Sequence, residues 1–156
     1  MENIEIRLAN PDELASLLAM FEKMYEHFHV ANGFTTLAEG GFERWMHGYE
    51  RSCDVSRVVL VAYSDSKPCG FIEGQIRLAS PTAIAEKTGH VAHLFVEQRH
   101  RRSKVGQQLF TTLSDWFASK RIRRESLEVV CNNMEGSEFW VSVGFKPLFV
   151  TYGRET

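Results

Sequence analysis

The chain has 156 residues, 44% of them hydrophobic and 24% charged, and its formal net charge is −2 at pH 7. This length fits one domain with a substantial core, which we place at residues 2–154. The charge balance excludes a general nucleic-acid-binding protein, and the sequence has no run of about 18 apolar residues that would predict a transmembrane helix.

The chain begins with a predicted strand and two predicted helices. Residues 4–8 alternate apolar and polar side chains, as a half-buried strand does. Asn10, Pro11 and Glu13 then have the order of a helix start, with an N-cap, a proline in the first turn and an acid three residues after the cap. Two apolar stripes at helical spacing predict core-facing sides, formed by Leu14, Leu17, Leu18, Phe21, Met24, Tyr25 and Phe28 and by Phe42, Trp45, Met46 and Tyr49.

A hairpin of two strands is predicted next. Residues 57–63 are continuously apolar, which predicts a strand that is buried on both faces. The turn formers at 64–68 predict a multi-residue turn, and residues 70–78 alternate again. Glu73 lies in the middle of this second strand, where its carboxylate is either on a solvated outer face or directed into a cleft.

A polar excursion at 79–89, with a short helical turn around 83–87, leads to a strand at 89–96. A basic loop follows this strand, and a helix is predicted over 105–120. A helix start exposes unpaired backbone N–H groups and the positive end of the helix dipole, so it suits an anion such as phosphate.

Several residues make this helix start a candidate anion site. Ser103 is the predicted N-cap, and three residues later stands Gly106 in place of the acid of a capping box. The helix start is therefore open to an external anion, and Arg101, Arg102 and Lys104 add positive charge. The alternative is a solvated, arginine-rich surface loop without a ligand.

The rest of the chain completes an α/β pattern. A strand is predicted at 125–130, a helix opens at Asn132 and Asn133 and ends at Gly144, and a last strand is predicted at 145–152. A crossover helix makes its flanking strands parallel neighbours, whereas the hairpins are antiparallel. The sequence therefore predicts a mixed α/β sheet in one domain.

Two motifs resemble those of the GCN5-related N-acetyltransferase (GNAT) superfamily. Arg101 and Gly106 occupy the first and last positions of its Arg/Gln-x-x-Gly-x-Gly/Ala signature. Asn133-x-x-Gly136-x-x-Phe139-Trp140, followed by Gly144-Phe145, is similar in spacing to a second family motif. The resemblance covers essentially the whole chain and implies the acyl-CoA N-acyltransferase fold.

The resemblance also implies a reaction, in which a substrate amine directly attacks the thioester of acetyl-CoA, with no metal. The implied pyrophosphate site is the loop and helix start at Arg101, Arg102, Ser103, Lys104, Val105, Gly106 and Gln107. The pantetheine arm is expected along Leu94, Phe95 and Val96, where a backbone N–H near Phe95 would stabilise the oxyanion. Asn133 and Trp140 complete the implied coenzyme site.

The sequence departs from the family pattern at two of these positions. Lys104 stands where a motif glycine is usual, and we expect lysine to take an ordinary φ there. Trp140 stands where many members have a tyrosine that protonates the leaving thiolate, and an indole N–H cannot do so. These departures leave open a second class, an acyl-CoA-binding sensor or regulator without turnover.

The base that takes the amine's proton has three candidates, Glu73, His93 and His90, of which we favour Glu73 and His93. Strand alternation predicts that His90 and His93 lie on opposite faces, so that one of them reaches the cleft. For each, the alternative is a structural side chain with a satisfied hydrogen bond.

The acceptor is expected to be a small-molecule primary amine. The strand from Gly70 to Arg77 and the Arg101-Arg102 pair resemble the aminoglycoside 6′-N-acetyltransferase branch, which accepts polycations. An acidic cleft would support such an acceptor, and its candidate carboxylates are Glu22, Glu26, Glu39, Glu43, Glu50 and Glu73. Amino-acid derivatives and protein amines remain alternatives.

The cysteines, the N-terminus and the family resemblance indicate the compartment and the assembly. The three cysteines are odd in number and lack metal-ligand spacing, which indicates reduced thiols in a cytoplasmic protein. The N-terminus lacks the layout of a signal peptide. No membrane or nucleic-acid partner is expected, and a homodimer is an assembly that the family resemblance implies.

Overall fold

A five-stranded sheet in the order β1-β2-β3-β4-β5 forms the centre of the computed structural model, which describes residues 3–80, 82 and 86–156. The strands are β1 (Ile4–Leu8), β2 (Arg57–Ser64), β3 (Lys67–Leu78), β4 (Lys87–Val96) and β5 (Glu125–Leu127). Strands β1 to β4 pair antiparallel, and β4 and β5 are parallel, which confirms the predicted mixed sheet. The helical turn predicted around 83–87 lies largely outside the described residues.

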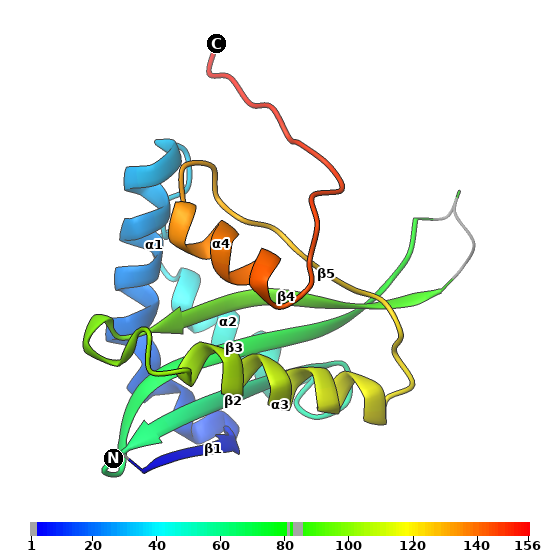
Figure 1. Cartoon of the computed structure of the whole chain (residues 1–156). Helices are drawn as coiled ribbons and strands as arrows, with labels where there is room; N and C mark the ends of the chain where they lie inside the picture. Colours follow the sequence, from blue (N-terminus) through cyan, green and yellow to red (C-terminus); the bar gives the residue numbers. More distant parts are fainter. Residues whose placement is uncertain (1–2, 81, 83–85) are drawn as a thin grey trace.

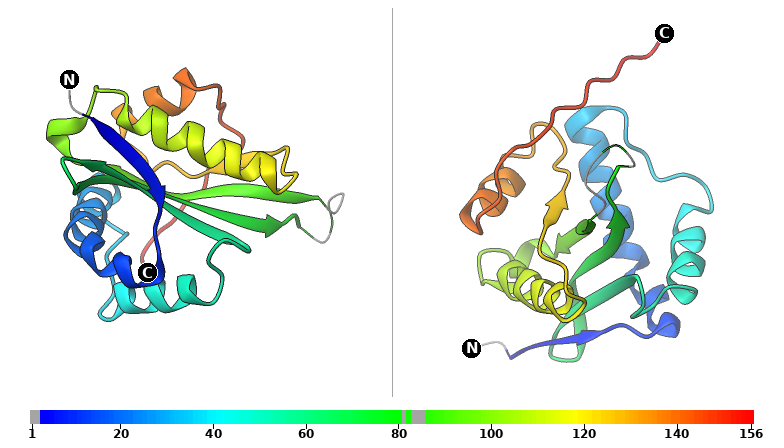
Figure 2. Two further views of the ribbon diagram at one scale, coloured as in Figure 1. Left: turned by 90° about the horizontal axis from the view of Figure 1, so that it is seen from below. Right: turned by 90° about the vertical axis from the view of Figure 1, so that its right-hand side faces the viewer.

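Helices cover both faces of this sheet (Figures 1 and 2). The 3-10 helix η1 (Pro11–Leu17) and the helices α1 (Leu18–Asn32) and α2 (Gly41–Glu50) cover one face. The helices α3 (Val105–Ser119) and α4 (Met134–Ser142) cover the other face, and a short 3-10 turn, η2 (Gln98–His100), precedes α3. Within the described residues, no helix has the length and apolar character needed to cross a membrane.

The predicted burial of β2 on both faces is confirmed. Val59 and Val61 pack with α1 and α2, whereas Val58 and Leu60 pack with α3. This alternation divides the core into two apolar layers that are separated by the sheet.

The first predicted helix starts at the expected place but begins as a 3-10 helix. The backbone N–H of Asn10 donates to Glu13 Oε2 at 2.9 Å, as in a capping box. Because a 3-10 helix has three residues per turn, the apolar stripe shifts before α1 begins. Leu18 was predicted to be core and is 39% exposed, whereas Leu14 is fully buried.

The turn between β2 and β3 is shorter than predicted. Ser64 pairs with Lys67, so Asp65 and Ser66 alone form the turn. Both residues have positive φ, 48° and 65°, as a type I′ hairpin turn requires. Lys67 and Pro68 therefore belong to β3 and not to the turn.

The last predicted strand, at 145–152, is wrong. Within the described chain this segment pairs with no strand, and it extends away from the body of the molecule (Figure 1). Phe149 and Tyr152 are each 92% exposed. Strand β5 is also shorter than the predicted 125–130, because its pairing with β4 stops at Leu127. A segment forms a strand only where a neighbouring strand has unpaired backbone N–H and C=O groups. Strand β5 has only three residues, so it offers few such groups to residues 145–152.

Candidate functional site

Strand β4 carries a bulge at the point where it separates from β5. The register pairs Glu73 with His93 but Gly74 with Val91, so Ala92 is an extra residue in β4. The parallel pairing with β5 ends at the same place, with Val91 as the last partner. A bulge bends its strand, and the two parallel strands therefore diverge into a wedge.

A pocket of about 560 Å³ occupies this wedge. Its walls are residues 91–96 of β4, residues 127–130 at and after the end of β5, the start of α3, and α4. Met24, His27 and Phe28 of α1 line it from the opposite face of the sheet. The pocket therefore passes through the sheet, from the side of α3 and α4 to the side of α1.

The free edge of β4 offers backbone hydrogen-bonding groups to this pocket. The N–H of Glu97 donates to the carbonyl of Cys69 at 2.8 Å, so residue 97 directs its backbone toward β3. In an antiparallel pair this direction alternates. The amide of Phe95 therefore also points toward β3, whereas the amides of Leu94 and Val96 point into the wedge.

The start of α3 is built by left-handed backbone and not by a serine cap. Ser103 was predicted as the N-cap, but its hydroxyl donates to the carbonyl of His100 at 2.6 Å. The N-cap is Lys104, with φ of 66°, and Arg102 has φ of 63°. The prediction of an ordinary φ for Lys104 is therefore wrong: lysine adopts the left-handed conformation that a glycine adopts readily. The first turn of α3 has no acidic residue, so its N–H groups face a site without a carboxylate of its own.

Replacing Lys104 tests this left-handed cap, because its side chain is exposed and is not part of the core. We expect Lys104→Gly to have a free energy of unfolding about 1 kcal/mol higher than Lys104→Ala, since alanine keeps the clash of Cβ in this region. Urea denaturation of the two variants measures the difference. Equal free energies would mean that the cap is not left-handed in solution.

Arg101 is held by contacts within the protein. Its Nε donates to the carbonyl of Val96 at 2.8 Å, and its guanidinium lies 5.6 Å from the ring centre of Phe95. A longer ion pair, 3.5 Å, joins it to Glu135 of α4. Arg101 thus joins the end of β4 to α4, and the exposed cations of this loop that line the pocket are Arg102 and Lys104.

Most of the residues predicted to bind coenzyme are brought together around the pocket. Those that line it are Leu94, Phe95, Val96, Arg101, Arg102, Lys104, Gly106, Gln107, Asn133 and Trp140. Ser103 and Val105 do not line it, because Ser103 bonds to the preceding turn and Val105 is buried in the core below α3. Asn133 is the N-cap of α4, and its side-chain oxygen accepts from Gly136 N–H at 3.0 Å.

Trp140 belongs to an aromatic cluster at the wall of the pocket. Its ring lies edge-to-face with Phe139, Phe110 and Phe145, at centroid distances of 4.9, 5.4 and 5.3 Å. Trp140 is 8% exposed. Its indole packs the α3–α4 junction and supplies no group that can transfer a proton.

Glu73 is fully buried beside the α1 end of the pocket, which excludes the first of the two predicted alternatives, a solvated outer face. Its carboxylate accepts hydrogen bonds from four side chains. The donors to Oε1 are Arg57 Nε at 2.9 Å, Arg57 Nη2 at 2.5 Å and Gln75 Nε2 at 2.9 Å, and the donors to Oε2 are Trp45 Nε1 at 2.7 Å and His93 Nδ1 at 2.5 Å. Burial alone would raise the pKa of Glu73, but the bond and charge of His93, followed by Arg57 and Gln75, lower this pKa from 4.5 to about 2.

His90 and His93 lie on the same face of the sheet, which corrects the predicted separation. Paired residues of neighbouring strands share a face, and the partners of these histidines are Gln75 and Glu73, two residues apart in β3. The bulge at Ala92 causes the change, because one extra residue reverses the alternation. His93 lines the pocket, whereas His90 contacts Ser126 of β5 at 3.2 Å, and burial lowers the pKa of His90.

Three residues of this cluster, Trp45, Arg57 and Gln75, were not predicted as site residues. Trp45 was assigned to the core stripe of α2, and Arg57 only begins the apolar run of β2. Gln75 follows Glu73 by two residues on the same face of β3, so strand alternation could have indicated this contact. Nothing in the local sequence links Trp45 of α2 or Arg57 of β2 to Glu73. No group of three His, Cys, Asp or Glu side chains within the described residues is arranged to hold a metal ion.

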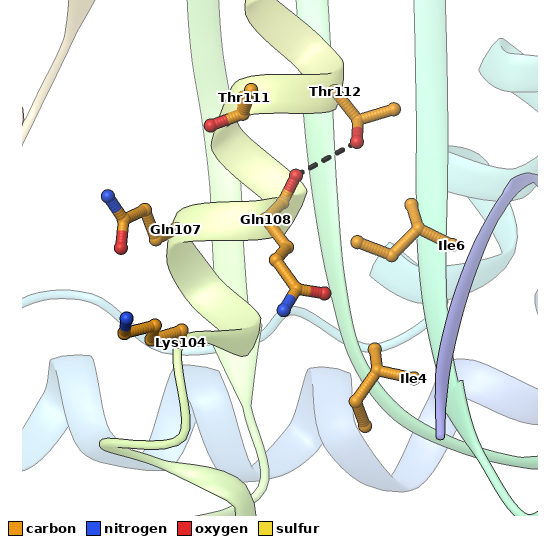
Figure 3. A pocket seen from close by; sticks show the side chains of 7 residues that line it. All are labelled: Ile4, Ile6, Lys104, Gln107, Gln108, Thr111 and Thr112. Atoms are coloured by element: carbon orange, nitrogen blue, oxygen red, sulfur yellow. Dashed lines mark hydrogen bonds between the residues drawn. The ribbon is translucent and has the colours of Figure 1, made fainter. Parts of the chain in front are cut away.

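A second, shallower hollow of about 400 Å³ lies on the outer side of α3, next to β1 (Figure 3). It is lined by Ile4, Ile6, Lys104, Gln107, Gln108, Thr111 and Thr112. Lys104 and Gln107 also line the main pocket, so the two hollows meet at the start of α3. This hollow has amide and hydroxyl groups but no acid–base pair, and it is not the candidate reaction centre.

Solved structures share this fold at low sequence identity. The aminoglycoside N-acetyltransferase AAC(6′)-Iy in complex with CoA matches with a TM-score of 0.81 and 15% identity, over 99% of this chain and 96% of that chain. The aminoglycoside 6′-N-acetyltransferase AAC(6′)-IG from Acinetobacter haemolyticus matches with a TM-score of 0.78 and 20% identity, over 97% and 98%. Glucosamine-6-phosphate N-acetyltransferase from Arabidopsis thaliana matches with a TM-score of 0.70 and 17% identity, over 99% of each chain.

At these identities the likeness shows the fold alone. The search of curated proteins found no match. The model of the acetyltransferase (GNAT) family, however, matches residues 17–145, which include α1, the sheet from β2 to β5, α3 and α4. This chain belongs to the acetyltransferase (GNAT) family.

Proposed function

We propose that the protein transfers the acetyl group of acetyl-CoA to the primary amine of a small molecule. The observation that carries this proposal is the pocket through the sheet, which joins the open start of α3 at one end to His93 at the other. Acetyl-CoA is elongated, with its phosphates at one end and its thioester at the other. It would fit this pocket with the phosphates at the start of α3 and the thioester near His93.

The chain's own groups supply the coenzyme site in this proposal. Backbone N–H groups of the first α3 turn, with Arg102 and Lys104, hold the pyrophosphate. Leu94 and Val96 pair with the pantetheine arm as an added strand would, because their amides face the wedge. Asn133 keeps the start of α4 in place through its cap, and Trp140 forms an apolar wall.

The reaction is a direct attack on the thioester. The amine nitrogen forms a bond to the carbonyl carbon, the C–S bond breaks, CoA leaves as a thiolate, and the amine loses one proton to a base. The developing oxyanion accepts from a wedge-facing amide, of Leu94 or Val96 and not of Phe95. Trp140 does not protonate the thiolate, so CoA leaves as the anion in this scheme.

The acceptor that fits best is a compact amine with an apolar body. Met24 and Phe28 line the α1 end of the pocket, and Glu73, the nearest buried carboxylate, is already paired with Arg57 and does not line the pocket. The predicted acidic set does not line the pocket, whose acidic residues are Glu128 and Glu135. A polycation needs several converging carboxylates, so this lining gives little support to an aminoglycoside-like acceptor.

A panel assay tests the proposed function. At about 100 times its dissociation constant, acetyl-CoA is expected to raise the midpoint of thermal unfolding by roughly 5–10 °C. Release of the CoA thiol is then followed over arylalkylamines, amino-acid amides, polyamines and an aminoglycoside. The absence of a thermal shift with acetyl-CoA would contradict the proposal.

The second candidate is an acyl-CoA sensor without turnover, which is favoured by the tryptophan at the position of a proton donor. Thermal stabilisation by acetyl-CoA together with no release of the CoA thiol with any amine would favour this candidate.

We also infer a cytoplasmic location, which Cys53 and Cys131 support as unbridged thiols. The homodimer stays a prediction, to be tested by light scattering.

A further inference from the structure

The two favoured base candidates, Glu73 and His93, differ in what their side chains can still do. Glu73 has no exposed surface, and both of its oxygens accept hydrogen bonds from other side chains. A carboxylate with this many donors has no lone pair left for an incoming amine. It also does not line the pocket, so a substrate proton cannot reach it directly.

The low pKa of Glu73, about 2, agrees with this geometry. A carboxylate that holds its negative charge so firmly is a weak base at neutral pH. What it offers instead is a fixed negative charge beneath an imidazole, maintained by the guanidinium of Arg57 at the opposite oxygen.

His93 has the complementary arrangement. Its Nδ1 bonds to Glu73 Oε2 at 2.5 Å, which leaves Nε2 as the ring nitrogen available to a substrate. The side chain is 15% exposed and lines the pocket next to the wedge-facing amide of Leu94. The ring is enclosed by Phe21, Tyr25 and Trp45, with centroid distances of 5.3, 6.3 and 6.4 Å. Aromatic walls on several sides hold the imidazole in one orientation.

We propose that His93 is the catalytic base, which takes the amine's proton at Nε2, and that Glu73 is a positioning residue, held by Arg57, Trp45 and Gln75. This assignment rests on the proposed N-acetyltransferase function. As the N–C bond forms, the proton leaves the amine nitrogen for Nε2, and the Nδ1–H bond to Glu73 stabilises the resulting imidazolium. Glu73 keeps its charge throughout and is not protonated.

The charged and titratable groups around the imidazole are few. Glu73 and Arg57 lie on β3 and β2, and His90 lies on the same strand as His93. On α1 the nearest is Tyr25, whose pKa is raised by burial and by the charge of Glu73, so its phenol stays neutral. The charge of Glu73 also acts to raise the pKa of His90, which does not line the pocket.

Three variants of the full chain test the assignment, assayed with acetyl-CoA and the best amine of the panel. His93→Gln removes the imidazole and is expected to lower kcat/KM on the order of 100-fold at pH 7, with unchanged acetyl-CoA binding. Glu73→Gln is expected to lower kcat/KM about 10-fold, because an amide carries no charge that stabilises the imidazolium. The matched control His90→Gln, on the same strand and face, is expected to leave kcat/KM unchanged.

A measurement without turnover keeps the assignment testable. Nitrogen-15 NMR of the histidine ring is expected to show the Nδ1-protonated tautomer for neutral His93, and a mixture of tautomers in Glu73→Gln. Wild-type kcat/KM in His93→Gln, or a wild-type His93 protonated at Nε2 instead of Nδ1, would overturn the assignment while the acetyltransferase function stands. Loss of turnover with every amine in the wild type would instead contradict the proposed function.

Discussion

Gly106→Glu is expected to weaken acetyl-CoA binding roughly 100-fold, a loss of about 2.7 kcal/mol. A Cβ at Gly106 would lie 3.6 Å from the ring of Phe139 and 3.8 Å from Val96, which are ordinary contacts. The backbone therefore accepts a side chain here, and a longer one must extend into the pocket that Gly106 lines. Its carboxylate would occupy the start of α3, where the phosphates are proposed to bind. Isothermal titration with acetyl-CoA measures the loss.

Two controls separate the causes of this loss. Gly106→Ala adds only the tolerated Cβ and is expected to bind within a few-fold of wild type, and Gly106→Gln has the size of glutamate without its charge. The stability of Gly106→Glu is expected to be at or above that of wild type, because an acid in the first turn of a helix is favourable. Unchanged affinity in Gly106→Glu would place the phosphates somewhere else.

Arg57→Met is expected to be the most destabilising of these substitutions, at about 3–5 kcal/mol. It removes both guanidinium bonds to Oε1 and leaves the fully buried carboxylate of Glu73 without its cation. Urea denaturation at pH 7 measures the free energy of unfolding. The double variant Arg57→Met with Glu73→Gln has no buried charge at this site, and we expect it to be more stable than Arg57→Met alone.

The pH dependence of this defect follows from the shifted pKa of Glu73. A carboxyl group whose folded pKa is lowered, here from 4.5 to about 2, contributes stability that is full above pH 4.5 and is lost as the pH falls through 2. Arg57→Met removes part of that lowering. The difference between wild type and variant is therefore expected to be largest at pH 7 and to shrink between pH 5 and pH 3, where the variant's carboxyl takes up its proton. A difference that does not depend on pH would contradict an electrostatic cause.

The features of the fold and of the site that the sequence predicted correctly are those that depend on local patterns of residues. The apolar run at 57–63 is buried on both faces, and the parallel pair of strands flanks α3 as expected. The sequence also predicted that the start of α3 has no acidic residue, because this depends only on the few residues of its first turn. In each case the signal and its structural consequence lie within one element or one crossover.

The rest depends on contacts between distant residues. The side of the sheet that His93 faces depends on the register between β3 and β4, which alternation within β4 alone does not contain. The burial of Glu73 depends on donors 16, 20 and 28 residues away in the chain. The lysine itself does not indicate the left-handed φ at position 104, and the one signal for it was the glycine that the family motif has there.

Because Ala92 is an extra residue in β4, the length of this strand determines whether the wedge between β4 and β5 is open. Removing it would restore regular pairing with β3 and extend the ladder with β5 into the wedge, while His93 would stay opposite Glu73 on the α1 face. One deletion would then close the coenzyme passage and leave the base in its place beside Glu73. Redesign of the acceptor preference should therefore leave the length of β4 unchanged and vary side chains of α1 instead, such as Met24 and Phe28, which line the pocket without setting its register.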